Sequence, residues 1–163
     1  LLSFLLEGLE IINKRDILLL DNLKKDELTR FAFLLIKSKN NPEDLKKKLK
    51  KSNKQIKELK ALCSNVAPIK TGLDAKKLKY FYGKCIAKKK YDLNLILYKN
   101  DSNKIILKIL NTWKIPKTPV NGLDLIDKGI KKSEIKILLK KIEKYWIDGG
   151  FKGSKKECLK QIF

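Results

Sequence analysis

The chain lacks histidine and methionine altogether, and arginine occurs only at positions 15 and 30. Without histidine, Ser-His-Asp and Cys-His nucleophilic catalysis are both excluded. Cysteine is scarce as well, and Cys63, Cys85 and Cys158 form no C-x-x-C pair. This spacing argues against a disulfide framework or a zinc site and predicts a reducing, cytoplasmic environment. We expect all three cysteines to be small buried hydrophobic residues.

Long apolar runs are also absent. No stretch approaches the roughly 18 residues that a membrane span requires, so none is predicted. The opening segment, Leu1–Leu6, has no basic flank and soon meets Glu7 and Glu10, which makes it a poor signal peptide. Because the chain does not begin with methionine, we expect it to be a piece of a longer protein or a trimmed form of one.

Acidic residues are few relative to basic ones. Lysine and arginine number 39 against 18 acids, for a net charge of +21 and an isoelectric point near 9.8. AT-rich coding can replace arginine by lysine, but it does not account for the shortage of acids. Such an excess predicts a polyanionic partner, either a nucleic acid or an anionic surface, and we favour a nucleic acid. The hydrophobic content of 43% is sufficient for a packed core.

Helix signals extend along the whole chain and predict an all-α, multi-helix fold. Tyr91–Tyr98 and Ile105–Trp113 are expected as helices, with strand as the alternative for either segment. Pro116 and Pro119 interrupt the pattern and set the predicted boundary between a body, 1–114, and a tail, 115–163. The expected helix starts are Asp21 or Asn22, Asn41–Asp44, Ser52–Gln55, Thr71–Asp74, Ser133 and Ser154–Glu157.

The helix expected after Ser133 combines an apolar stripe with a row of lysines. The core-facing stripe is Ile135, Leu138, Leu139, Ile142 and Trp146. The lysines recur at every fourth residue: Lys132, Lys136, Lys140 and Lys144. Like charges at this spacing repel by a few tenths of a kcal/mol per pair, and phosphates would offset that cost. The row therefore indicates an RNA-binding face, with a merely solvated face as the alternative.

A second lysine stripe precedes and crosses Ser52, with the same two interpretations. Its members are Lys47, Lys50, Lys51, Lys54 and Lys57. No aromatic residue is interleaved with them, so they are expected to contact phosphate and sugar and not to read bases.

Other chemistry-bearing residues have structural interpretations. We expect Tyr145, Trp146 and Phe151 to pack between helices, although they could form a stacking platform. Gly149 is expected to end the long helix in a left-handed conformation. Asp124 suits a helix start and needs no metal there. No catalytic or metal-ligating residue is predicted.

Several segments, taken in order, resemble one enzyme family. Pro119, Val120, Gly122, Asp124, Leu125 and Gly129 fit the pattern P-V-x-G-x-D-L-x-x-x-G, and the paired leucines and Trp146 follow it. Leu49–Leu59 fits L-x-x-S-N-x-x-x-x-x-L, and Thr29–Leu35 resembles the helix that precedes that segment. From about residue 24 onward the chain resembles the C-terminal body and tail of bacterial CCA-adding tRNA nucleotidyltransferases and the related poly(A) polymerases.

The resemblance implies a specific division of labour. The family's catalytic head, with its G-G-x-x-R-D loop and D-x-D metal pair, has no counterpart here. The chain would grip tRNA or a similar structured RNA, and a head on another chain or on a missing N-terminal part would use ATP or CTP with Mg²⁺. Alone it is predicted to be inactive. The alternative is a non-catalytic basic helical module that binds a protein partner, through the apolar residues 1–9, or an anionic surface.

Overall fold

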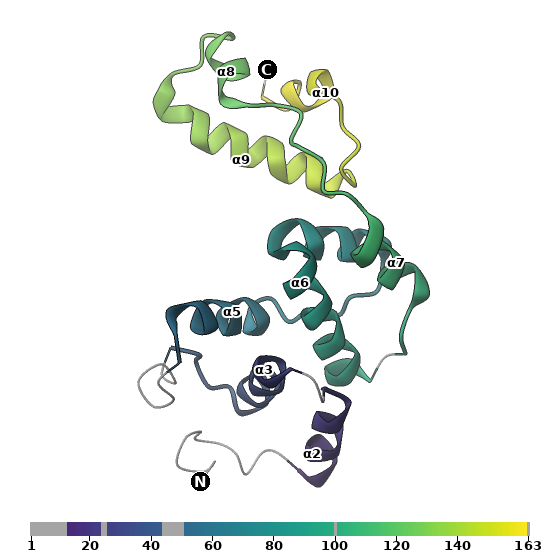
Figure 1. Cartoon of the computed structure of the whole chain (residues 1–163). Helices are drawn as coiled ribbons and strands as arrows, with labels where there is room; N and C mark the ends of the chain where they lie inside the picture. The colour runs from purple at the N-terminus through teal and green to yellow at the C-terminus, as the bar shows by residue number, and fades with distance from the viewer. Residues whose placement is uncertain (1–12, 24–25, 44–50, 100, 163) are drawn as a thin grey trace. The chain divides into compact units, whose positions relative to one another are not determined.

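The computed structural model describes residues 13–23, 26–43, 51–99 and 101–162. Within these ranges the chain forms α-helices and a 3-10 helix but no strand, which confirms the predicted all-α fold. The chain divides into two compact units, Leu1–Trp113 and Lys114–Phe163. The elements are α2 (Lys14–Leu20), the 3-10 helix η2 (Asp21–Leu23), α3 (Glu27–Ser38), α5 (Asn53–Cys63), α6 (Gly72–Tyr98), α7 (Lys104–Thr112), α8 (Gly122–Ile126), α9 (Lys132–Asp148) and α10 (Lys155–Leu159) (Figure 1).

Helix starts follow local side-chain chemistry. Ser52, Thr71 and Ser154 each accept from the backbone N–H three residues on, and the acid or amide at that position bonds back. These reciprocal capping boxes satisfy amides that a helix start leaves unpaired, and all three were predicted. The start of α3 was placed wrongly at Asp21 or Asn22. Asp26 caps it instead, by accepting from the N–H and the hydroxyl of Thr29.

One core of the first unit lies among α3, α5, the end of the α2–η2 segment and the second half of α6. Phe33, Leu59 and Leu62 are fully buried or nearly so, and Leu93 of α6 joins them. Burying side chains of this size contributes roughly 1.5–3 kcal/mol each. The packing fixes α5 against α3 and brings residues far apart in the sequence side by side.

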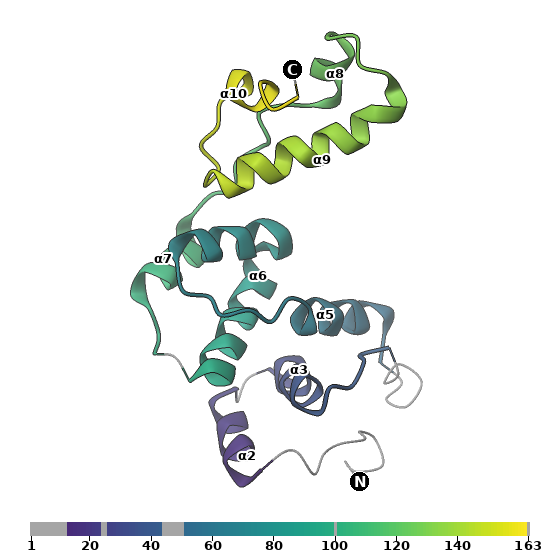
Figure 2. The same ribbon diagram turned by 180° about the vertical axis from the view of Figure 1, so that it is seen from behind.

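A second core depends on a bend in α6. Gly83 has φ +73° and ψ 171°, a conformation that is essentially restricted to glycine. The helix changes direction there (Figures 1 and 2). As a result, Leu78 before the bend and Tyr91 after it both belong to the cluster that includes Leu110 of α7. The regions 91–98 and 104–112 are both helical, so the alternative of strands is excluded.

The second unit is built around α9. Ile142 and Trp146 are buried as predicted, and Leu125 of α8 and Cys158 of α10 are fully buried. Helix α9 begins at Lys132, one residue before the predicted start at Ser133, so that prediction was wrong. Its N-cap residue, Lys131, makes no side-chain capping hydrogen bond.

The end of α9 is a Schellman motif. Gly150, with φ +76°, adopts the left-handed conformation, whereas Gly149 has φ −74°, so the prediction was off by one residue. The N–H of Phe151 donates to the Trp146 carbonyl and that of Gly150 to the Ile147 carbonyl. The Trp146 and Phe151 rings supply the accompanying apolar contact, with centroids 5.1 Å apart.

Three further predictions have different outcomes. Cys158 is buried and Cys63 is half-buried, but Cys85 is exposed, so the expectation of three buried cysteines was wrong. The bend at Gly83 separates Cys85 from the packed face of the first half of α6. The expected apolar element within 1–12 and most of the helix expected from Asn41–Asp44 lie outside the described residues.

Candidate nucleic-acid interface

The lysine row of α9 lies on the surface. Lys132, Lys136, Lys140 and Lys144 are all exposed, while Ile142 and Trp146 face the core. Four residues of an α-helix advance about 6 Å and overshoot a full turn by about 40°. The four ammonium groups therefore follow a shallow spiral about 18 Å long on the side of α9 flanking its packed face. A row of this length can contact several consecutive backbone phosphates.

The row is not neutralised within the described part of the chain. None of its four lysines forms an ion pair or a hydrogen bond with another described side chain. Of the acids on the same helix, Glu143 is half-buried and lines a cavity with Trp146 and Val120. The α9 row thus keeps its positive charge in solvent.

Only part of the second predicted lysine stripe is exposed and without an acidic partner among the described residues. Lys51 is half-buried: its Nζ lies 2.7 Å from Glu27 Oε1 and 5.7 Å from the centre of the Phe31 ring. Lys54 and Lys57 are exposed on α5. Lys47 and Lys50 lie outside the described residues. The structure therefore gives α5 two exposed candidate lysines and uses Lys51 to join α5 to α3.

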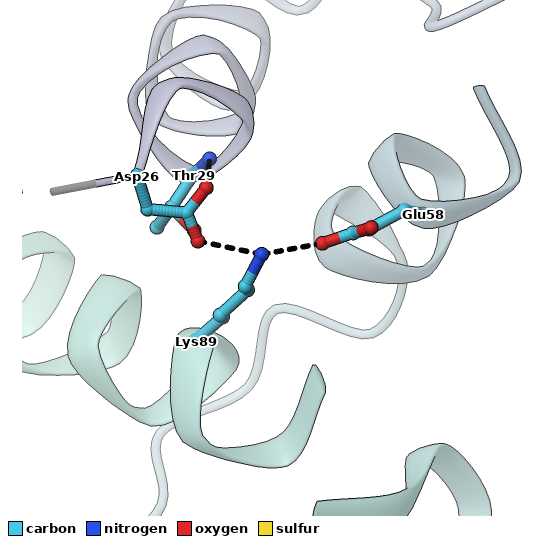
Figure 3. A network of polar contacts seen from close by, with 4 residues as sticks. All are labelled: Asp26, Thr29, Glu58 and Lys89. Carbon is cyan, nitrogen blue, oxygen red and sulfur yellow. Dashed lines mark hydrogen bonds and ion pairs between the residues drawn. The ribbon is translucent and has the colours of Figure 1, made fainter. Parts of the chain in front are cut away.

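Lys89 of α6 connects three helices. Its ammonium lies 2.7 Å from Asp26 Oδ2 and 2.5 Å from Glu58 Oε1, on α3's cap and on α5 (Figure 3). Burial alone would lower the pKa of Lys89, but the hydrogen bonds to both carboxylates outweigh it and raise that pKa. This lysine has a structural function that the sequence analysis did not identify.

Lys90, the next residue, is 6% exposed and caps the end of α5. Its Nζ donates to the carbonyls of Ala61 at 2.7 Å, Leu62 at 3.1 Å and Ser64. It also lies 4.7 Å from the centre of the Tyr82 ring. Burial lowers the pKa of Lys90 to about 8. The last carbonyls of a helix have no partner within the helix, and Lys90 supplies one from a residue almost thirty positions away.

The connector 64–71 between α5 and α6 is held along α6 (Figure 2). Asn94 donates to the Ala67 carbonyl at 2.8 Å and accepts from the Ile69 N–H at 3.0 Å. The Tyr98 hydroxyl donates to the Val66 carbonyl, and the Tyr82 hydroxyl shares a 2.9 Å hydrogen bond with Ser64 Oγ. Side chains of α6 therefore hold the connector in place by bonding to several of its backbone groups.

A periodic signal could have identified Lys90 and Asn94. Ala87, Lys90, Tyr91 and Asn94 recur at the spacing of one helical face, and all four are buried. Polar residues at positions of an apolar stripe are expected to have hydrogen-bond partners. The run of three lysines at 88–90 concealed this signal.

The aromatic residues fall into two groups. Trp146 is buried, as predicted, and packs edge-on against Phe151 in the Schellman motif, whereas Tyr145 is 41% exposed, so the expectation that it packs between helices was wrong. Phe81, by contrast, is 61% exposed beside a cavity of about 540 Å³ in the first unit. Phe81 lies three residues after Leu78, at helical spacing, but of the two only Leu78 is buried.

Asp124 of the second unit has a structural role. Asp124 accepts from the Asn121 N–H at 2.9 Å and lies 2.6 Å from Lys155 Nζ. The hydrogen bond from Lys155, supported by that from Asn121, lowers the pKa of Asp124. Over the described ranges, no group of three or more Cys, Asp or Glu side chains is arranged to hold a metal ion. No described helix has the length and apolarity needed to cross a bilayer.

No protein-family model and no curated protein matches this chain. The resemblance to CCA-adding enzymes thus rests on the residues quoted above and stays a prediction.

Proposed function

We propose that this chain is the RNA-binding C-terminal part of a tRNA nucleotidyltransferase, a CCA-adding enzyme or a poly(A) polymerase. The observation that carries the RNA-binding half of the proposal is the α9 row, whose four exposed lysines have no acidic partner among the described side chains. A-form RNA displays phosphates and 2′-hydroxyls along its surface, which ammonium groups bind without reading bases.

The charge of the second unit supports the same partner. Residues 114–163 contain thirteen lysines and six acids, so the unit is positive as a whole. Each lysine that neutralises a phosphate releases condensed counterions. Binding through the four lysines of the row should give a slope of about −3 to −4 in log affinity against log salt.

The enzymatic half of the proposal follows from the resemblance. The tail pattern from Pro119 to Gly129 is that of proteins in which body and tail hold tRNA. Addition of C, C and A, or of A alone, would then depend on ATP or CTP and Mg²⁺ in a head domain carried by another chain or another part of the protein, acting on RNA in the cytoplasm.

Filter binding of tRNA at several salt concentrations tests the RNA-binding half. The double variant Lys136→Glu, Lys140→Glu should bind tRNA at least tenfold more weakly and with a shallower salt slope, because four units of charge change on the row. The matched control is Lys128→Glu, Lys152→Glu, which makes the same charge change at exposed positions of the same unit outside α9. Equal losses in both variants, or salt-independent binding by the wild type, would reject the row as the interface.

Incubation with tRNA, labelled ATP or CTP, and Mg²⁺ tests the enzymatic half. The purified chain alone should incorporate no nucleotide. Robust addition by the chain alone would contradict the assignment of catalysis to a separate head.

A protein partner is the second candidate. On α2, Ile17 is 57% and Leu18 is 68% exposed, and adjacent exposed apolar side chains of this size favour contact with another protein. If tRNA does not bind at low salt, a pulled-down partner whose binding is lost in Ile17→Ser, Leu18→Ser would identify the chain as a docking module.

A further inference from the structure

The cavity of about 540 Å³ in the first unit lies between the connector 64–71 and the part of α6 before its bend. Its volume is within the range of small-molecule sites, roughly 300–1,000 Å³. The walls that matter for recognition are Asn65, Pro68, Ile69, Leu78, Phe81 and Tyr82. They are apolar or aromatic, with a carboxamide among them.

Two of these walls are aromatic rings in fixed positions. Phe81 is 61% exposed and is supported on one side by Tyr80, with ring centroids 5.3 Å apart and planes at 83°. Tyr82 is fixed by its hydroxyl bond to Ser64 and by the ammonium of Lys90 over its ring. Much of the Phe81 ring is therefore in solvent beside the cavity, where a planar ligand can stack on it.

Polar groups of the cavity provide both hydrogen bonding and charge. Asn65, in a left-handed conformation with φ +44°, places its Nδ2 3.5 Å from the Tyr82 hydroxyl and is otherwise exposed. Its carboxamide can therefore donate to and accept from the edge of a base. Lys77 lines the cavity and Lys70 is exposed on the connector, whereas Lys76 and Lys79 of the same stretch contact α7 and the residue after it. The single acid of residues 70–82 is Asp74.

That acid is already engaged. Asp74 Oδ2 accepts from the N–H and the hydroxyl of Thr71, both at 2.8 Å, and from the Lys70 N–H at 3.1 Å. Burial alone would raise the pKa of Asp74, but these hydrogen bonds outweigh it and lower that pKa. The carboxylate belongs to the helix cap, and Lys77 and Lys70 favour an anionic ligand.

We propose that this cavity binds the base of an unpaired nucleotide, stacked on Phe81, with Asn65 at the base edge and the phosphate toward Lys77 and Lys70. The proposal rests on the proposed function in taking RNA as the natural source of that nucleotide. It extends that function because the lysine row recognises phosphates only. An aromatic side chain of a protein partner would fit the apolar walls but would not use the positive charge.

Fluorescence anisotropy with a labelled twelve-residue oligoadenylate and an abasic strand of equal length measures the contribution of the bases. Base–aromatic stacking predicts that the wild type binds oligoadenylate at least about fivefold more tightly than the abasic strand. Phe81→Ala should remove this difference without changing the salt slope, and Phe81→Trp should retain it. Tyr145→Ala, a change of an exposed aromatic residue in the other unit, is the matched control and should retain the preference. Because Phe81 is mostly exposed, its replacement should leave the melting temperature nearly unchanged.

Equilibrium dialysis with AMP distinguishes the source of the nucleotide. Binding of AMP that is lost in Phe81→Ala would assign the cavity to free nucleotides as well as RNA, whereas binding of the oligomer alone would assign it to an RNA strand. Equal affinity of the wild type for adenylate and abasic strands, together with no Phe81-dependent binding of AMP, would overturn the proposal. A base preference unaffected by Phe81→Ala would also overturn it.

The outcomes for the two proposals are separable. If Lys136→Glu, Lys140→Glu does not weaken tRNA binding but Phe81→Ala removes the base preference, the α9 interface fails and the cavity stands. If the charge reversals weaken tRNA binding and no base preference exists, the cavity fails and the α9 interface stands.

Discussion

The two units differ in how far their lysines take part in the fold, although the second unit also has an ion pair, between Lys155 and Asp124. In the first unit, the ammonium groups of many lysines contact carboxylates, helix-end carbonyls or an aromatic ring of the same unit. These are Lys37, Lys51, Lys60, Lys76, Lys79, Lys89 and Lys90. In the second unit, the four lysines of the α9 row have no such contact with the described residues. A high lysine content is therefore not in itself a measure of the charge available to a partner.

The difference has a physical cause in burial. The second half of α6 is packed against α5 and the connector, so lysines on that face must find acceptors at close range. On α9, only one stripe is packed, and its lysines lie beside that stripe. The energetic consequences differ accordingly. Removing a lysine that makes contacts within the first unit should destabilise the fold, whereas removing a lysine of the α9 row should weaken binding.

The largest effect on stability should come from Lys90→Met. Methionine keeps an apolar side chain of similar length but leaves the carbonyls of Ala61, Leu62 and Ser64 without their donor. Burying acceptors without a partner costs about 1–3 kcal/mol, so we expect the free energy of unfolding to fall by about 2–3 kcal/mol. Urea denaturation monitored by circular dichroism measures this loss.

Lys84→Met is the matched control for that experiment, since Lys84 is an exposed residue of the same helix. It should change the free energy of unfolding by less than about 0.5 kcal/mol. If Lys90→Met has an equally small effect, the description of Lys90 as the cap of α5 is wrong.

A smaller effect is expected from Lys89→Met, which removes the ammonium shared by Asp26 and Glu58. The three side chains are partly exposed, so solvent screens the ion pairs. We expect a loss of about 1–2 kcal/mol at neutral pH. The same urea denaturation applies, and a more stable variant would show that repulsion or desolvation dominates this network.

The pH dependence of the same network has a definite sign. Burial alone would raise the pKa of Asp26, but hydrogen bonds from Lys89 and Thr29 outweigh it and lower that pKa. A carboxyl whose pKa is lowered in the folded state stabilises the fold above its unfolded pKa, and this contribution is lost as the pH falls through the folded pKa. Stability should thus decline on acidification below about pH 4, and less steeply in Lys89→Met. Parallel acid titrations of the two proteins would expose an error in this assignment by giving identical slopes.

The smallest effect on stability is expected from Lys136→Met, Lys140→Met. Removing two members of a like-charged row relieves repulsion of a few tenths of a kcal/mol per pair, so stability should stay constant or rise slightly. Thermal denaturation at low salt measures it. A loss of more than about 1 kcal/mol would mean that the row is part of the fold, and the contrast between the units would disappear.

Some local features were predictable to the residue, and others were missed by one residue or more. The capping boxes at Ser52, Thr71 and Ser154 involve partners three residues apart, so the sequence contains both halves of each interaction. The packed stripe of α9, with Ile142 and Trp146, follows from helical periodicity in the same way. Where two signals of the same type compete nearby, as Asp21 and Asp26 do before α3, the pattern does not choose between them.

Other features depend on contacts between distant residues. Leu78 is buried because it packs in one cluster with Tyr91 and Leu110, whereas Phe81, at helical spacing from Leu78, is exposed. Asn94 and Lys90 are buried because α5 and the connector pack over them. Which residues of α5 and the connector contact them cannot be read from a single sequence. The cavity beside Phe81 arises from the same packing.

The amino-acid sequence by itself determined the helical fold class, the capping boxes at Ser52, Thr71 and Ser154 and the lysine row of α9, because each depends on residues that are close together in the sequence. The tertiary structure decided which lysines remain in solvent and which become internal donors. That choice depends on where distant carbonyls and carboxylates lie once α3, α5 and α6 are packed together, and on the cost of burying a charge or a polar group without a partner.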